Sequence, residues 1–229
     1  MTHSPPTTIA IDGPAASGKT TVALLLAEKL GYFMFDTGWM YRAVTWAVLR
    51  DGIDVNDEAA IIALAKRLKM SVHAVVEPRD GRQYTVLVDG VDVTWGLRTA
   101  DTDTNVSSVA KIGAVREEMV RRQREIGLEG NVVMVGRDIG TVVLPDAPLK
   151  IYIVASAEER ARRRWLENRD SEPDIDFERI LNAVRIRDER DSNRAHSPLR
   201  PADDAVEIDS THQTPEEIVE RILGLIDAR

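Results

Sequence analysis

Short apolar runs alternate along the chain with longer segments in which apolar residues recur at helical spacing. Five of the short runs are apolar on both faces, as the strands of a parallel sheet covered by helices must be. The alternation predicts an α/β fold in which a parallel five-stranded sheet is flanked by helices. The predicted strands are Thr8–Asp12, Tyr32–Asp36, Val132–Val135, Leu149–Val154 and Ala205–Ile208.

Helix boundaries can be read at several points. Residues 22–30 place their apolar side chains on one helical face, and Gly31 follows as a C-terminal stop signal. The segments Ser156–Glu159 and Thr214–Glu217 both have the pattern of a capping box. Pro215 suits the first position of the last helix.

The pattern changes between Leu68 and Thr94, where polar and apolar residues alternate in runs broken by proline and glycine. This predicts a small antiparallel β insertion. A helix over residues 57–69 precedes it, and a helical stretch follows to about Ile126. Residues 168–176, polar and irregular between two arginine-rich helices, are typical of a flap.

Composition narrows the class of protein. The 229 residues include 38 acidic and 30 basic side chains, and a net charge of -8 argues against a nucleic-acid partner. The absence of cysteine excludes disulfides and thiolate metal sites, and the four histidines are scattered. With no signal-like start and no apolar stretch of about 18 residues, we expect a cytoplasmic protein without membrane contact.

The strongest motif is Gly13-Pro14-Ala15-Ala16-Ser17-Gly18-Lys19-Thr20, which fits G-x-x-x-x-G-K-[ST] between a predicted strand and a predicted helix. Its backbone N–H groups and the helix N-terminus suit phosphate oxygens. Lys19 would meet the β and γ phosphates, and the Thr20 hydroxyl would bind Mg²⁺. The alternative is an ordinary glycine turn. The motif predicts a donor nucleotide and leaves the acceptor open.

A second polar segment, Asp36–Arg42, begins where the second predicted strand ends, beside the phosphate loop. The planar guanidinium of Arg42 could bind a phosphorylated acceptor through paired hydrogen bonds. Alternatively, Asp36 or Thr37 is a helix N-cap and Arg42 is a surface side chain.

A third polar segment, Gly136–Thr141, follows another predicted strand at the same edge. Arg137 can pair with phosphate, and Asp138 can accept a hydrogen bond from an exocyclic amine or an arginine. A turn with a local Arg137–Asp138 pair would explain the same residues.

Further along, Arg187, Asp191 and Arg194 share one helical face, where two cations bracket a carboxylate. They could hold transferring phosphate, or they could be a solvated salt-bridged helix. The same two interpretations apply to Arg160 and residues 162–164 on the preceding helix. Together with the polar flap, this arginine-rich helix resembles a lid that closes over a substrate.

Taken together, six segments resemble the bacterial cytidylate kinase family, in the same order and over nearly the whole chain. They are GPAASGKTT, DTGWMYR, VRRQR, GRDIGTVVLPDA, SAEERARRR and RDERDSNRAHSPL. The resemblance implies one nucleoside monophosphate kinase domain over 1–229, a P-loop NTPase-type fold with a lid near 160–178. It also implies an acceptor-binding part near 37–130 that carries the β insertion at 68–94.

The resemblance also assigns site residues. ATP would be bound by residues 13–21 with Arg160 and Arg164, and cytosine by Thr37, Ser107, Arg116 and Asp138. The acceptor phosphate would be bound by Arg42, Arg137 and Arg194, the ribose region by Arg187 and Asp191, and Tyr41 would pack beside the acceptor. Lys19, Arg137, Arg187 and Arg194 would carry catalysis. Two departures are Trp39, where the family has a small residue, and Gly113, where it commonly has proline.

The implied reaction moves the γ-phosphoryl group of ATP, with Mg²⁺ as cofactor, onto CMP or dCMP in a monomeric enzyme. Three alternatives remain open at this point. The first is a kinase of the same fold for UMP, dTMP or shikimate. The second is a nucleotide-binding switch without an acceptor, which the arginine-rich segments and the lack of an N-K-x-D motif disfavour. The third, a nucleic-acid binder, is disfavoured by the acidic balance.

Overall fold

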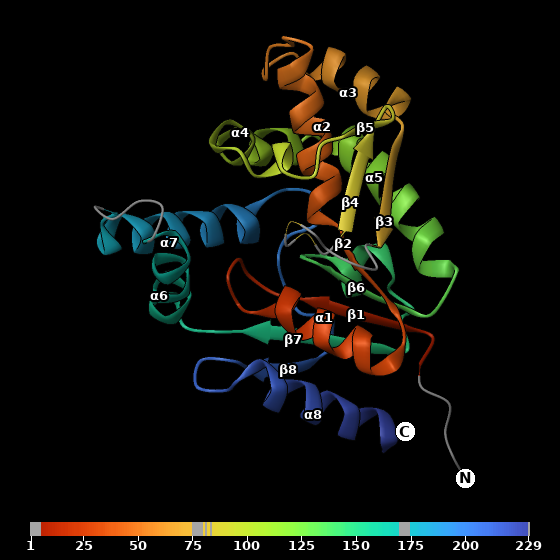
Figure 1. Cartoon of the computed structure of the whole chain (residues 1–229), viewed down its shortest axis with the longest axis vertical. Coiled ribbons are helices and arrows are strands. Elements are labelled where there is room, and N and C mark those ends of the chain that lie inside the picture. Colours follow the sequence, from red (N-terminus) through yellow and green to blue (C-terminus); the bar gives the residue numbers. More distant parts are fainter. Residues whose placement is uncertain (1–5, 75–79, 81, 83, 170–174, 229) are drawn as a thin grey trace. The chain divides into compact units, whose positions relative to one another are not determined.

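The computed structural model describes residues 6–74, 80, 82, 84–169 and 175–228 (Figure 1). They divide into two compact units. The first unit consists of the chain up to Asp36 and from Ile126 onward, and the second is Thr37–Glu125. The second range lies close to the residues 37–130 that the family resemblance assigns to the acceptor-binding part.

The first unit contains a five-stranded sheet in the order β2-β6-β1-β7-β8. Every neighbouring pair is parallel. The fold class predicted from the sequence is therefore confirmed. The strands are β1 (Thr8–Asp12), β2 (Phe33–Asp36), β6 (Val132–Gly136), β7 (Leu149–Val154) and β8 (Val206–Asp209). No predicted strand is missing, and each boundary lies within one residue of its predicted position.

One face of this sheet is covered by α1 (Lys19–Leu30) and α8 (Pro215–Asp227), which lie side by side in Figure 1. Ile9 and Ile11 of β1 point into this core together with Leu26 of α1 and Ile222 of α8. Because alternate strand residues face one side, the buried face fixes the register of β1. The core holds rigid the carboxyl edge of the strands, where the phosphate loop begins.

The predicted helix signals are largely confirmed. Gly31 ends α1 in a left-handed conformation with φ 68°. Thr214 and Glu217 form a reciprocal capping box, and Pro215 is the first residue of α8. In α6 (Ala157–Asn168) only half of the predicted box forms: Ser156 accepts the Glu159 N–H, while the Glu159 carboxylate pairs with two arginines. A charge-assisted pair is the stronger partner for that carboxylate.

The helices α6 and α7 (Phe177–Asn193) have a small core of their own. Ala161 of α6 packs with Ile180, Leu181 and Val184 of α7. Trp165 adds a hydrogen bond from Nε1 to the carbonyl of Ile175, at 3.2 Å. Part of the predicted lid, residues 170–174, lies outside the described residues.

The second unit begins with the helices α2 (Gly38–Arg50) and α3 (Glu58–Arg67). The antiparallel sheet β3-β4-β5 follows, which confirms the predicted insertion among the described residues. After the 3₁₀ turn η1 come two helices, α4 and α5, where the sequence predicted one helical stretch. The remaining bounds are β3 (Met70–Ala74), β4 (Tyr84–Val88), β5 (Val91–Asp92), η1 (Gly96–Arg98), α4 (Ala100–Ala110) and α5 (Gly113–Leu128).

Arg122 of α5 ties that helix to the C-terminal end of α3. Its guanidinium donates to the carbonyls of Ala65, Lys66 and Leu68. Its Nε meets Glu118 at 2.6 Å. Carbonyls at the C-terminal end of a helix have no partner inside the helix, so the Arg122 guanidinium supplies their hydrogen bonds. Its positive charge also stabilises the negative end of the helix dipole. Across the described part of both units, no helix is both long and apolar enough to cross a bilayer.

Candidate active site

The phosphate loop, residues 13–20, leaves β1 and enters α1. Gly13 has φ 150°, and a Cβ there would lie 2.1 Å from the carbonyl oxygen of Ile153. Gly18 has φ 84° and precedes the first residue of α1. Only glycine can occupy the first position without moving β7, and the second requires a left-handed backbone. These constraints distinguish the loop from an ordinary turn.

Lys19 is buried, with 6% of its surface exposed, and its Nζ donates to the carbonyl of Pro14 at 2.9 Å. Burial first, and then the charge of Arg137, lower the pKa of Lys19 well below its usual value. A bound anion would reverse this effect because it favours the charged amine. The hydroxyl of Ser17 is also buried and lacks a hydrogen-bond partner. Both side chains fit a loop built to hold phosphate oxygens.

Thr20 is the residue predicted to bind the metal. Its hydroxyl lies 3.2 Å from Oδ2 of Asp36, at the end of β2. Two oxygen groups so placed beside a phosphate loop are the type of ligand that Mg²⁺ prefers. Within the described ranges, no group of three His, Cys, Asp or Glu side chains could hold a metal. Mg²⁺ bound here would take its other ligands from phosphate oxygens and water.

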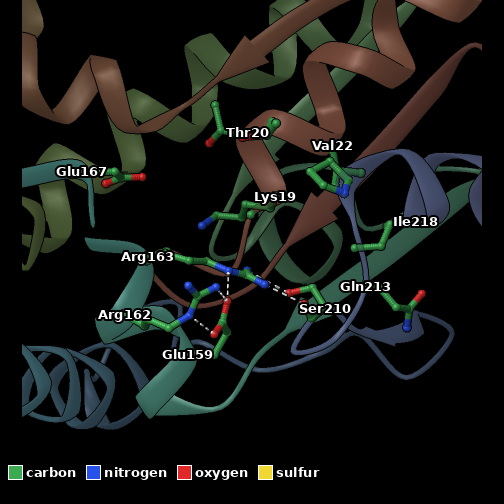
Figure 2. A pocket seen from close by; sticks show the side chains of 14 residues that line it. Lys19, Thr20, Val22, Glu159, Arg162, Arg163, Glu167, Ser210, Gln213 and Ile218 are labelled. Carbon is green, nitrogen blue, oxygen red and sulfur yellow. Dashed lines mark hydrogen bonds and ion pairs between the residues drawn. The ribbon is translucent and has the colours of Figure 1, made fainter. Parts of the chain in front are cut away.

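A cavity of about 370 Å³ opens beside the loop, and Figure 2 shows the side chains that line it. Lys19, Thr20 and Val22 approach from α1. Glu159, Arg162, Arg163 and Glu167 approach from α6, and Ser210, Gln213, Pro215 and Ile218 come from the end of β8 and the start of α8. The cavity thus combines cations near the loop with apolar side chains, as a nucleotide site requires.

The loop after β6 is anchored to the end of β1. Both carboxylate oxygens of Asp12 accept backbone N–H groups, from Ile139 at 2.8 Å and from Gly140 at 2.7 Å. Burial raises the pKa of Asp12 to about 6, although these two hydrogen bonds act in the opposite direction. Asp12 thereby holds the start of η2 (Ile139–Val143), next to the predicted site residues Arg137 and Asp138.

Arg137 pairs with α7. Its Nε lies 3.1 Å from Oδ2 of Asp191, and both side chains are about one-fifth exposed. The local Arg137–Asp138 pair that the sequence allowed is therefore not the ion pair that this arginine makes. Nor is Asp191 part of an exposed helical salt bridge, because its partner lies at the end of β6. Arg187 is close enough to contribute to the lowered pKa of Lys19, so both Arg137 and Arg187 lie within electrostatic range of Lys19.

The structure separates the arginines of the predicted lid. Arg160 is buried and forms a double ion pair with Asp188 of α7, at 2.8 and 2.5 Å. Arg163 lines the cavity, whereas the predicted ligand Arg164 is not among the lining residues. Arg194 follows α7 and donates from Nε to the carbonyl of Ser197.

The second unit holds the other predicted acceptor residues. The Arg116 guanidinium lies 5.1 Å from the centre of the Tyr41 ring and donates to the carbonyl of Ala110. Arg42 is not a free surface side chain, because it donates to the Leu97 carbonyl at 2.8 Å and pairs with Asp103 at 2.6 Å.

Two further residues of this group differ in exposure. Thr37 precedes α2 and is buried, but its side chain makes no capping bond. Ser107, on α4, is exposed.

Sequence reasoning did not find Ser210, Gln213 or Asp188. Ser210 and Gln213 follow β8 at the carboxyl edge of the sheet, where parallel α/β folds bind ligands, and that position was an available signal. Asp188 had no such signal. It is one of several acidic residues on α7, and only the packing of α6 against α7 selects it.

Comparison with known proteins agrees with these features. A model of the cytidylate kinase family matches residues 9–228. A cytidylate kinase of Chloroflexus aggregans is 52% identical over 96% of this chain and 93% of that protein. One of Desulforamulus reducens is 51% identical over 96% of each.

A solved structure from Eubacterium ventriosum, of an uncharacterized protein, shares the fold with a TM-score of 0.52 at 14% identity. It covers 97% of this chain and 99% of that one. The family match spans the phosphate loop, the Arg137–Asp191 pair and the β insertion together, and the chain belongs to the cytidylate kinase family.

Proposed function

We propose that this chain transfers the γ-phosphoryl group of ATP to CMP or dCMP, giving ADP and CDP or dCDP. The observation that carries the proposal is the buried Lys19 in a complete phosphate loop, with Arg137 and Arg187 close enough to lower its pKa. Such a concentration of positive charge is costly without an anion. It suits the transfer of a phosphoryl group between two phosphorylated substrates.

ATP binds with its phosphates on residues 13–21. The cavity beside the loop supplies room for the nucleoside, with the partly exposed Pro215 as an apolar contact. Arg163 lines this cavity, so it replaces Arg164 as our preferred ATP contact, while Arg160 donates to the Ala15 carbonyl of the loop.

The acceptor phosphate is the nucleophile, and no protein side chain is needed for that role. One of its oxygens forms the new bond to the γ phosphorus, while the bond from that phosphorus to the bridging oxygen of ADP breaks. Lys19, Arg137, Arg187 and Arg194 stabilise the charge on the transferring oxygens. Thr37, Ser107, Arg116 and Asp138 recognise cytosine, and Arg42 exchanges Asp103 for the acceptor phosphate.

Mg²⁺ is the proposed cofactor, and the Thr20 hydroxyl with Asp36 beside it would hold the ion. When bound, it neutralises charge on the β and γ phosphates of ATP. Asp36 is thus our proposal for the second protein ligand, beside Thr20. Replacing Asp36 with Asn should raise the Mg²⁺ concentration needed for half-maximal activity, whereas an unchanged requirement would exclude it as a ligand.

A monomeric state and a cytoplasmic location stay predictions made from the sequence. Light scattering during size-exclusion chromatography tests the first of these.

The function is tested by offering MgATP with CMP, dCMP, UMP, AMP, GMP and dTMP separately and measuring nucleoside diphosphate formed above a control without acceptor. Turnover with CMP and dCMP and little with purines is expected. Turnover mainly with another acceptor would keep the kinase and refute the cytosine assignment. ATP binding without transfer to any acceptor would indicate a switch. In the variant Asp138→Ala, the preference for cytosine should weaken, and an unchanged acceptor profile would refute the role of Asp138 in reading the base.

A further inference from the structure

Three carbonyl oxygens of the phosphate loop accept hydrogen bonds from side chains. Lys19 donates to Pro14 from within the loop motif. The other two donors come from distant parts of the first unit. Nη1 of Arg160, on α6, donates to the Ala15 carbonyl at 3.3 Å. The hydroxyl of Ser210, just after β8, donates to the Ser17 carbonyl at 2.9 Å.

These two contacts determine where the loop N–H groups point. A trans peptide is planar, and its carbonyl and N–H point in opposite directions. When Arg160 holds the Ala15 carbonyl, the N–H of Ala16 in the same peptide must therefore point away from Arg160. In the same way, the hydrogen bond from Ser210 to the Ser17 carbonyl makes the N–H of Gly18 point away from Ser210. Ala16 has φ 59° and Gly18 has φ 84°, so both lie in the left-handed region, which is unfavourable for alanine. External hydrogen bonds help to keep this conformation.

Both donors are held in place by further partners and have little capacity left for a ligand. Arg160 is 4% exposed, and its Nε donates to the Ala155 carbonyl. Its Nη1 and Nη2 both donate to the carboxylate of Asp188. Ser210 is 1% exposed, and its hydroxyl accepts from Nη1 of Arg163 at 3.2 Å while it donates to Ser17. A residue so occupied acts through the loop more readily than on the nucleotide.

We propose that Arg160, oriented by Asp188, and Ser210 are positioning residues that hold the Ala16 and Gly18 N–H groups of the phosphate loop toward the donor phosphates. The inference rests on the proposed function, because it assumes that the loop binds ATP. It adds a route by which the helices α6 and α7 influence nucleotide affinity. No direct contact between those two side chains and ATP is needed.

The test uses the full chain and two variants, Ser210→Ala and Asp188→Asn. ADP binding is measured by titration calorimetry and adenosine binding by competition, with melting temperature as a check on folding. Each variant should bind ADP about tenfold more weakly, the effect expected from one lost or misdirected hydrogen bond to a charged group. Adenosine affinity should stay the same, because adenosine has no phosphates for the loop to hold. In turnover, KM for ATP should rise while KM for CMP stays the same.

Arg185→Ala is the matched control. Arg185 pairs with Glu158 and so joins α6 to α7 as the Arg160–Asp188 pair does, but both side chains are about three-fifths exposed and neither lines the cavity. ADP affinity should not change in this variant. An equal loss in Arg185→Ala, or an equal loss for adenosine and ADP, would overturn the positioning role.

The remaining outcomes separate this inference from the proposed function. A wild-type chain that binds ADP, with both variants binding it equally well, would overturn the inference alone. A wild-type chain that does not bind ADP would overturn both. If Asp188→Asn does not fold, Ser210→Ala decides the outcome, because removing one hydroxyl leaves the packing of α6 on α7 intact.

Discussion

Replacing Asp12 with Asn should make the protein more stable at neutral pH and less active. Asp12 is 4% exposed, and burial raises the pKa of its carboxyl from 3.8 to about 6. The folded state thus binds this proton more tightly than the unfolded state does. The stabilising contribution of Asp12 is complete below pH 4 and is lost as the pH rises through 6.

The magnitude follows from the size of the shift. Because the pKa rises from 3.8 in the unfolded chain to about 6 in the folded one, ionisation of Asp12 costs the folded protein about 3 kcal/mol of stability as the pH increases. Roughly half of this loss occurs above pH 5. Asn cannot ionise, and like the protonated carboxyl it offers one good acceptor to the two N–H groups of Ile139 and Gly140. The free energy of unfolding of Asp12→Asn should therefore rise relative to wild type by about 1.5 kcal/mol between pH 5 and pH 8.

Urea unfolding of both proteins at pH 5, 6, 7 and 8, followed by circular dichroism, measures this difference directly. The control is Asp146→Asn, which changes an exposed carboxylate, so its difference from wild type should not vary across the same range. A difference for Asp12→Asn that is constant or falls with pH would refute the argument. Phosphoryl transfer should fall in Asp12→Asn at every pH, because a mispaired N–H at Ile139 or Gly140 displaces the loop that carries Arg137 and Asp138.

Three further substitutions test separate parts of the structure. Lys19→Ala should lower kcat by about 10²-fold or more without lowering the melting temperature, since a buried cation is lost along with its desolvation cost; near-normal turnover would refute the role of the loop. Gly13→Ala should abolish ATP binding, measured by calorimetry, because its Cβ would lie 2.1 Å from the Ile153 carbonyl; normal affinity would show that β7 can move. Arg122→Ala should cost about 2 kcal/mol of stability in urea unfolding, because three carbonyls at the C-terminal end of α3 lose their donor, and a loss below about 0.5 kcal/mol would mean that water replaces it.

Much of the fold could be predicted because its signals are local. The strands β1 and β7 have the predicted bounds, since each is a short apolar run that a two-sided core requires. The phosphate loop could be located because its glycines must occupy particular backbone conformations at a fixed spacing. The capping box of α8 depends on two residues three positions apart. The break between α4 and α5 was missed although Gly113 stands at the start of α5, because a single glycine inside a helical pattern can also continue the helix.

The partners of the charged side chains were decided only by the tertiary structure. Helical spacing places Arg187 and Asp191 on one face of α7, but that Asp191 meets Arg137 depends on where β6 ends relative to α7. The Arg160–Asp188 pair and the Ser210–Ser17 bond likewise join residues 28 and 193 positions apart. A sequence pattern indicates which face of an element is polar. Strand order and helix packing decide which two polar faces meet. The packing of all the buried apolar side chains together determines that arrangement, so no single segment of the sequence specifies it.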